Sequence, residues 1–239
     1  MSEIISAITL ALNNYIDKLY STFIEDQRYM LLVEGLGNTL IIALGALVIG
    51  VVIGSIIAIA KYFAEDDPRL RAVKWLCDTY TTVIRGIPVV VLLLICFFLV
   101  LKRLDGVTVA IIAFGINSGA YVAEIVRSGI QAVDAGQMEA GRSLGMSRGQ
   151  TMWQIILPQA MKNILPAIGN EMISLLKETS VAGYVAVTDL TRGGNLIRNN
   201  TYDAFNPLMV VALTYLVMVI GLTALLGKVE TRLRKGDKR

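Results

Sequence analysis

The chain contains 239 residues, of which 55% are hydrophobic and 17% are charged, and its net charge is +3. This charged fraction is below the roughly 25% typical of soluble domains, and the basic residues form no stripe that would favour nucleic acid binding. With no histidine and only two cysteines, we expect no imidazole or thiolate metal site and no histidine-based catalytic triad.

Residues 1–28 are predicted to form an amphipathic N-terminal extension. Apolar side chains recur at three- and four-residue spacing, with polar residues between them, which is typical of a helix with one apolar face. These apolar positions are Ile5, Ile8, Leu12, Ile16, Leu19 and Phe23. We expect this helix to lie on the membrane surface or on the flank of a helix bundle.

Residues 29–239 are predicted to form an all-α membrane domain with about five transmembrane helices, because a membrane span needs about 20 mostly apolar residues. The expected spans are residues 32–60, 82–101, 107–126, 164–187 and 207–226. The connections 61–74 and 188–206 are expected to be polar loops. In the first span, Gly50 and Gly54 favour close packing against another helix.

Lysine and arginine lie mainly in alternate connections between these spans, which indicates the orientation of the chain. One side carries the basic residues of 61–74, of 127–162 and of the C-terminal tail 228–239. The opposite side carries fewer basic residues. This pattern predicts an N-terminus outside the cell and a C-terminus in the cytoplasm, with the polar insert 128–160 on the cytoplasmic side.

The polar insert contains the sequence EAGRSLGMSRGQTMWQIILP, from Glu139 to Pro158, which predicts two short helices. Gly145 is expected to separate them, Ser147 to cap the second by accepting a backbone N–H, and Pro158 to end it. Apolar residues among polar neighbours favour either docking into a groove on a partner protein or a position on the lipid headgroups.

This segment resembles the EAA loop of permease subunits in ATP-binding-cassette importers. The shared pattern is Glu139-Ala140-Gly141, three residues, Gly145, nine residues and Ile155-x-Leu157-Pro158, with Gly141 where alanine is commonest. Four further segments resemble the polar amino acid uptake branch of that family: LGNTL at 36–40, RGIPVVV at 85–91, INSGAYVAEIVRSGI at 116–130 and GNEMISLLKETS at 169–180. The span after Pro88 departs from that branch because it lacks the usual glutamine.

The resemblance implies a multi-pass permease subunit of the bacterial cytoplasmic (inner) membrane, folded as an importer-permease bundle with a cytoplasmic coupling helix. Besides membrane lipid, it implies three kinds of partner: two copies of an ATPase subunit, a second permease subunit (the same chain or a paralogue) and an extracytoplasmic amino acid binding protein. The residues expected to couple to the ATPase are Glu139, Ala140, Gly141, Ser143, Leu144, Gly145, Met146, Ser147, Leu157 and Pro158.

The chain has no GxxxxGK[ST] phosphate-binding motif, so we expect it not to be an enzyme and to bind no cofactor itself. ATP and Mg²⁺ are expected on the partner ATPase. The alternatives are an ATP-independent channel or exporter for small polar solutes, and an intramembrane enzyme. The residues offer the enzyme hypothesis no evident nucleophile or metal partner.

Ionisable residues at membrane depth are costly and usually face a cavity or a partner. The candidates for binding an amino acid substrate are Asn117, Glu171, Lys177, Glu178, Thr179 and Ser180. Lys177, or a helix N-terminus near Thr179 and Ser180, could hold the carboxylate of a zwitterionic amino acid. Glu178 or Asn117 could accept hydrogen bonds from its ammonium group.

The spacing of the charged residues also predicts structural contacts. Glu171 and Glu178 are seven residues apart and are expected on nearly one face of a helix. Alternatively to substrate binding, Lys177 and Glu178 could form ion pairs with other helices. Glu124 and Arg127, three residues apart, are expected to form a structural pair.

Overall fold

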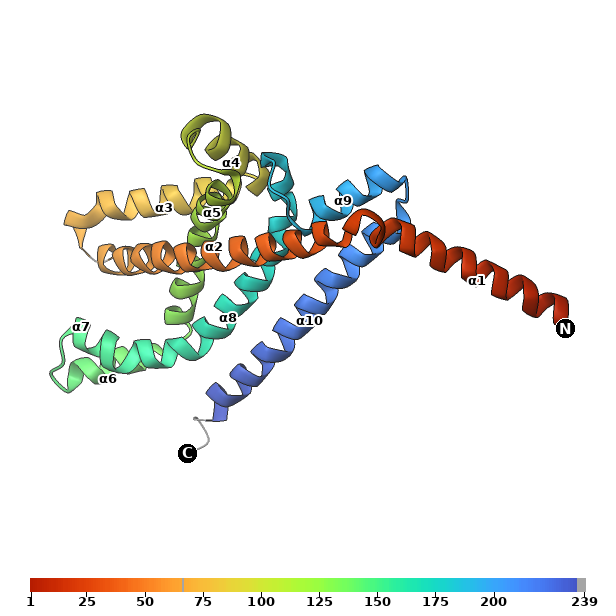
Figure 1. Ribbon diagram of the computed structural model, residues 1–239. Helices are drawn as coiled ribbons and strands as arrows, with labels where there is room; N and C mark the ends of the chain where they lie inside the picture. Colours follow the sequence, from red (N-terminus) through yellow and green to blue (C-terminus); the bar gives the residue numbers. More distant parts are fainter. Residues whose placement is uncertain (66, 236–239) are drawn as a thin grey trace.

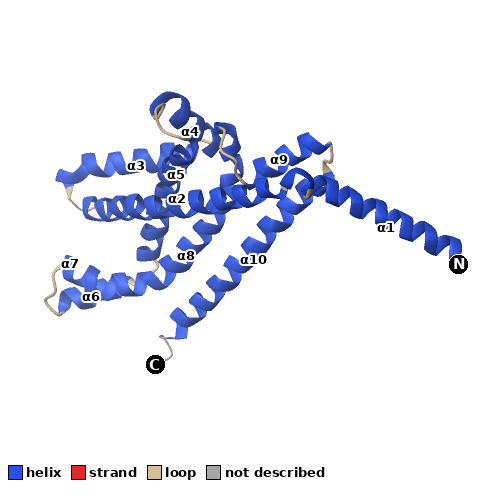
Figure 2. Ribbon diagram, in the orientation of Figure 1, coloured by secondary structure: helices blue, strands red, loops and turns tan. Residues whose placement is uncertain are grey.

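The computed structural model of the protein describes residues 1–65 and 67–235, so residues 236–239 of the predicted basic tail lie outside the described residues. Every regular element in the described part is a helix (Figure 2), which confirms the all-α prediction. The α-helices are α1 (Ser2–Phe23), α2 (Tyr29–Ala64), α3 (Arg71–Gly86), α4 (Val89–Ile95), α5 (Gly106–Gln131), α6 (Ala135–Ser143), α7 (Arg148–Thr151), α8 (Leu157–Glu178), α9 (Leu190–Thr201) and α10 (Phe205–Lys235).

Helix α1 covers most of the predicted N-terminal extension and projects from the rest of the molecule (Figure 1). Three polar contacts attach it to the start of α10, one of them from the Thr22 hydroxyl, which donates to Asp203 Oδ2 at 3.3 Å. The Tyr15 hydroxyl donates a hydrogen bond of 2.8 Å to Asn206 Oδ1. Lys18 Nζ lies 3.6 Å from Asp203 Oδ1. Because Asp203 and Asn206 are buried, these contacts supply partners that buried polar groups need.

Helices α2 and α5 pack against each other through glycines. A Cβ atom on Gly50 would lie 2.6 Å from Ser118 Oγ, and a Cβ atom on Gly54 would lie 2.6 Å from Val122 Cβ. Real Cβ atoms do not approach other atoms so closely, so only glycine permits this separation of the two backbones. The close packing predicted from the glycine spacing is therefore present.

The predicted span 82–101 is divided between two helices. The helical segment before Gly86 and the segment Val89–Val100 meet at an angle of 105°. Proline has a fixed φ and disfavours the helical conformation in the preceding residue, and Ile87, before Pro88, is extended with ψ 130°. The chain therefore bends here. The predicted loop 61–74 was too long, because α2 continues to Ala64 and α3 begins at Arg71.

Three helical stretches of the described residues are long and apolar enough to cross a membrane: Glu25–Ala64, Gly106–Gln131 and Phe205–Leu233. They contain three of the five predicted spans. The bent pair α3–α4 adds a fourth if it crosses as one unit. The predicted span 164–187 falls on most of α8, from Ile164 onward, and on the 3₁₀ helix Thr179–Val185. Helix α8 does not meet the same criterion, so a fifth span stays a prediction.

The connection 188–206, predicted to be a loop, contains helix α9, so this prediction was wrong. Asp189 begins the helix by accepting the backbone N–H of Thr191 at 2.9 Å. Two consecutive glycines favour a loop when the sequence is taken alone, but here they permit close packing. A Cβ atom on Gly193 would lie 2.4 Å from the carbonyl oxygen of Leu31 in α2.

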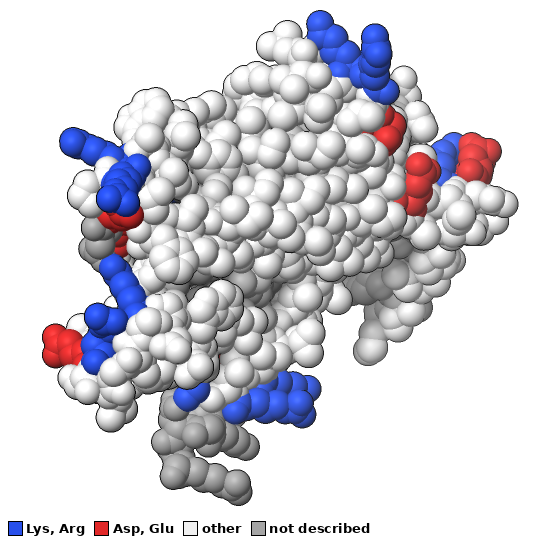
Figure 3. Space-filling model, turned by 90° about the vertical axis from the view of Figure 1, so that its left-hand side faces the viewer, with Lys and Arg blue, Asp and Glu red and all other residues white. Residues whose placement is uncertain are grey.

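The two ends of the molecule carry different segments. The α2–α3 turn and the helices α6 and α7 lie at one end, whereas α9 and the N-terminus lie at the other (Figure 1). On the face shown in Figure 3, charged side chains lie toward the edges and a broad area between them carries none. Such an uncharged area is expected where a helix bundle contacts membrane lipid.

Candidate functional site

Helices α6 and α7 form a compact two-helix segment whose turn depends on Gly145. This residue has φ +82°, a left-handed conformation that glycine adopts without steric cost. The Met146 N–H donates to the Gly141 carbonyl at 3.1 Å, and the Gly145 N–H donates to the Arg142 carbonyl at 3.0 Å. This pair of hydrogen bonds is the Schellman motif that ends many helices, so the predicted glycine break is present.

Ser147 begins the second helix, as predicted. Its hydroxyl accepts the Gln150 N–H at 3.2 Å, and the Gln150 side chain accepts the Ser147 N–H at 2.8 Å. Together they form a capping box, which satisfies two backbone donors at the helix start. Gly141 has a packing role here, because a Cβ atom at this position would lie 2.5 Å from Thr151 Cγ2. The glycine in place of alanine therefore lets α6 and α7 approach each other.

Pro158 does not end the second helix, so this prediction was wrong. A π-helical turn, Met152–Ile156, joins α7 to α8, and Pro158 lies in the first turn of α8. The backbone stays helical through Ile156 and Leu157, so the N–H that Pro158 lacks falls where the hydrogen bonding changes from the π to the α pattern. The two-helix segment α6–α7 is consequently continuous with α8.

The residues predicted to contact an ATPase lie mostly on the surface. Leu144 is 81% exposed and Trp153 is 59% exposed, whereas Met152 and Ile156 are buried against the chain. The exposed members of the predicted coupling set are Glu139, Ala140, Ser143, Leu144, Gly145, Ser147 and Pro158. Gly141 is buried, and Met146 and Leu157 are half-buried. The segment thus presents two large apolar side chains among polar neighbours.

A second candidate site lies between α5 and α8, where polar side chains meet inside the bundle. Asn117 Nδ2 donates to Glu178 Oε2 at 3.4 Å, which joins two of the predicted substrate-binding residues. Glu171 lies two turns earlier in α8, close enough to interact electrostatically with Glu178. The Glu171 carboxylate lies near the Ser118 hydroxyl. This hydroxyl is buried and has no hydrogen bond of good geometry in the described residues.

The other predicted substrate-binding residues lie differently. Lys177 is exposed, and Thr179 is buried with its hydroxyl donating to the Leu176 carbonyl at 2.7 Å. Ser180 lines a polar cavity of about 520 Å³ beside α9. The predicted helix N-terminus at Thr179 and Ser180 is absent, because α8 continues directly into a 3₁₀ helix.

The expected structural pair and the ion pairs considered as an alternative have different outcomes. Arg127 Nε donates to Glu124 Oε2 at 2.9 Å, so the predicted structural pair is present. Among the described residues, the ion pairs include none for Lys177 or Glu178. The acceptor of the buried Asn117 amide is therefore a carboxylate without a basic partner within ion-pair distance.

Sequence reasoning missed the residues of the polar cavity beside α9. Arg192 Nη1 donates to the Gly183 carbonyl at 2.6 Å, and Asp189, fully buried, caps α9. Both side chains line the cavity. An aspartate at the start of a polar segment is an N-cap signal, which could have indicated the helix and with it the position of Arg192.

The long apolar helices are those of a membrane protein, and comparison with known families shows its class. Residues 50–235 match the family described as the binding-protein-dependent transport system inner membrane component. This match covers more than half of the chain, so the chain belongs to this family. The resemblance to importer permease subunits is thereby confirmed.

Individual relatives and solved structures show which members of this family the chain is similar to. The arginine transport system permease protein ArtQ of Bacillus subtilis (strain 168) is 38% identical over 210 residues, which are 86% of this chain and 94% of the relative. The probable glutamine ABC transporter permease protein GlnM of the same organism is 35% identical over 211 residues, which are 87% of this chain and 95% of the relative.

A solved structure described as an amino acid ABC transporter with histidines matches with a TM-score of 0.80 and 41% identity, over 88% of this chain and 98% of that chain. An inward-facing structure of the MetNI methionine ABC transporter matches with a TM-score of 0.75 over 86% of this chain and 97% of that chain. Its identity is only 20%, so this second likeness concerns the fold alone.

Proposed function

We propose that the protein is the permease subunit of an ATP-driven importer of polar amino acids. Membership of the family supports a permease, and the arginine and glutamine permeases among its relatives support a polar amino acid as the cargo. The observation that carries the proposal is the coupling segment, because the spacing of the EAA loop falls on an exposed two-helix segment with defined caps.

Helices α6 and α7 serve as the coupling helix and dock into a cleft on a separate ATPase subunit. Leu144 and Trp153, both exposed, supply apolar contact area, and Glu139 supplies charge at the start of the motif. Two ATPase copies, which bind ATP and Mg²⁺, act on two permease subunits that are identical or paralogous. The translocation pathway lies between these two permease subunits.

Substrate meets the polar site between α5 and α8. Glu178, held by Asn117 at 3.4 Å, accepts the ammonium group of the amino acid, and Glu171 adds negative charge two turns away. Charged groups inside a membrane bundle usually mark a substrate path. Lys177, Thr179 and Ser180 contribute toward the α9 end of this path, where a polar cavity contains Ser180.

The orientation follows from the basic residues. The coupling segment and the C-terminus are cytoplasmic, and the N-terminus and α9 lie outside, where an extracytoplasmic binding protein delivers the amino acid. Five crossings of the bacterial inner membrane result, with α3–α4 as one bent span and α8 with its 3₁₀ extension as another.

The test is reconstitution of the permease with its ATPase and binding protein in liposomes. We expect uptake of radiolabelled arginine or glutamine that needs ATP on the ATPase side and binding protein on the other. Vesicles with permease alone should take up none. Uptake that is independent of ATP would instead establish the alternative, a channel or exporter, and refute the proposal.

A further inference from the structure

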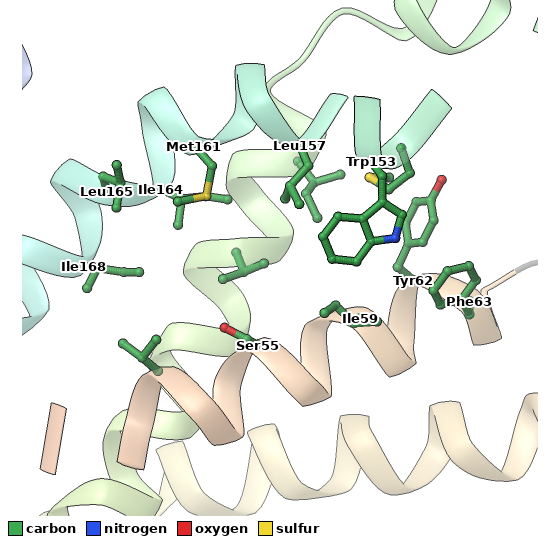
Figure 4. Close-up of a pocket in the computed structure, with 14 residues that line it drawn as sticks. Ser55, Ile59, Tyr62, Phe63, Trp153, Leu157, Met161, Ile164, Leu165 and Ile168 are labelled. Carbon is green, nitrogen blue, oxygen red and sulfur yellow. The ribbon is translucent and has the colours of Figure 1, made fainter. Parts of the chain in front are cut away.

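An apolar cavity of about 280 Å³ lies between the second half of α2 and the start of α8 (Figure 4). Fourteen residues line it, and only Ser55, Tyr62 and Trp153 among them carry a polar side-chain atom. A zwitterionic amino acid would find no charged partner in this lining, and burial of an unpaired charge is costly. The cavity is therefore unsuited to the proposed transport substrate.

The cavity is elongated, and part of its wall is exposed on the surface of the molecule. Tyr62, Phe63 and Trp153 lie at one end, and Leu165 and Ile168 lie at the other (Figure 4). Ile59 is 42% exposed and Phe63 is 46% exposed, so parts of the wall also belong to the outer surface. The wall is continuous with the lipid-facing side of α2, because the neighbouring Val52 and Ile56 are exposed as well.

The positively charged side chain of Arg148 lies at the Tyr62 end of the cavity. The guanidinium carbon of Arg148 lies 4.9 Å from the centroid of the Tyr62 ring, and Arg148 Nε donates to the Tyr62 hydroxyl at 3.1 Å. Arg148 lies in α7, on the end of the molecule that holds the coupling segment.

We propose that the acyl chain of an anionic phospholipid from the leaflet next to the coupling segment occupies this cavity, with its phosphate beside Arg148. The apolar wall matches hydrocarbon, the guanidinium matches the charge of the phosphate, and the wall is continuous with the exposed apolar side of α2. Positive side chains at the membrane surface attract anionic lipids.

Such a lipid would contact the joint between the coupling segment and the membrane helices. Met152 and Trp153 belong to the π-helical turn that links α7 to α8, and both line the cavity. On the opposite wall, Ile59 and Phe63 belong to α2. Filling the space between them would limit how far the turn can move toward α2.

The test uses phosphatidylcholine vesicles with a small fraction of phosphatidylglycerol that carries a diazirine in one acyl chain. The permease is reconstituted, irradiated and digested, and the adducts are mapped by mass spectrometry. We expect adducts to concentrate on residues that line the cavity, such as Ile59, Trp153 and Met161. Adducts spread evenly over the exposed face of α2 would overturn the proposal.

A matched pair of variants tests the cavity itself. Ser55→Phe places a ring in the cavity, whereas Val52→Phe places the same ring on the lipid-facing side of α2. We expect Ser55→Phe to lower the adduct yield about tenfold by displacing several methylene groups, and Val52→Phe to leave it unchanged. Ile59→Trp fills the cavity from a more exposed position in case Ser55→Phe does not fold. Equal yields in filled and control variants would refute the site.

The headgroup contact is tested by competition between phosphatidylglycerol and phosphatidylcholine probes. Arg148→Gln should lower the preference for phosphatidylglycerol about fivefold, and Arg148→Lys should keep most of it. An unchanged preference in Arg148→Gln would refute the headgroup assignment. A disulfide between two copies of Trp153→Cys would show that a second copy of the chain covers the cavity, and would overturn the lipid proposal. No part of this test requires the ATPase.

Discussion

Replacing Gly145 by valine should leave membrane insertion intact and weaken the coupling of ATP hydrolysis to uptake. Gly145 has φ +82°, and a Cβ atom there would meet nothing within 4 Å. The cost is therefore one of backbone conformation rather than packing. A left-handed conformation costs an L-residue about 1–2 kcal/mol, which changes the population of the native turn by a factor of about 5–30.

The assay measures ATP hydrolysis and amino acid uptake in the same proteoliposomes. We expect the ratio of uptake to hydrolysis to fall in Gly145→Val, because α7 would meet the ATPase in a changed orientation. Gly149→Val is the matched control, since Gly149 also has open space around it but no positive φ. Gly145→Asn should retain most of the coupling, because asparagine tolerates the left-handed conformation better than valine.

Equal coupling in Gly145→Val and Gly149→Val would refute the reasoning from the Gly145 turn. Circular dichroism and the amount of protein in the membrane would show whether either variant fails to fold. A loss of coupling in Gly145→Asn as large as in Gly145→Val would also contradict this reasoning. We expect coupling to fall from glycine to asparagine to valine at position 145, in the order in which these residues tolerate the left-handed conformation.

Three further outcomes are expected. A cysteine from Ser147→Cys should resist a membrane-impermeant maleimide in intact cells, whereas one from Asn199→Cys should react; the reverse order would refute the proposed orientation. Glu178→Gln should raise the half-saturation concentration for uptake about ten- to a hundredfold, because a charge-assisted hydrogen bond is worth about 1.5–3 kcal/mol. An unchanged half-saturation with a lowered Tm would leave Glu178 a structural role only. Gly54→Ala should cost about 1–3 kcal/mol of stability, since the new methyl would lie 2.6 Å from an α5 side chain. Gly37→Ala meets nothing within 4 Å and should leave the Tm unchanged or slightly raised, because alanine favours a helix more than glycine does; equal losses would contradict the packing argument.

The features that could be predicted from the sequence are those with local causes. Long apolar runs predicted the spans that correspond to α2, α5 and α10, because hydropathy alone decides whether a helix is apolar enough to cross a membrane. Gly145 predicted the turn between α6 and α7, and Ser147 predicted the N-cap of α7. Both effects are local, because each residue determines the conformation or hydrogen bonding of the backbone next to it. The glycine spacing at Gly50 and Gly54 indicated a close contact, although not its partner.

The features that could not be predicted depend on the rest of the fold. Pro158 is a helix-end signal in the sequence, but the chain passes it without leaving the helical conformation, at the point where a π-helical turn is followed by α8. The consecutive glycines of α9 read as a loop, but they pack against α2 and α10. The contact between Asn117 and Glu178 joins positions 61 residues apart, and a single sequence carries no record of such a pairing.

The glycine contacts between α2 and α5 limit which parts of the protein can move. Each helix inserts side chains into glycine positions of the other: Ser118 and Val122 at Gly50 and Gly54, and Ile49 and Ile53 at Gly115 and Gly119. Rotation or sliding of one helix along the other would bring side chains against the backbone at four positions together. We expect the pair to move as one body, so that conformational change takes place elsewhere in the chain, such as at the bend at Pro88, the link from α5 to α6 and the 3₁₀ helix after α8.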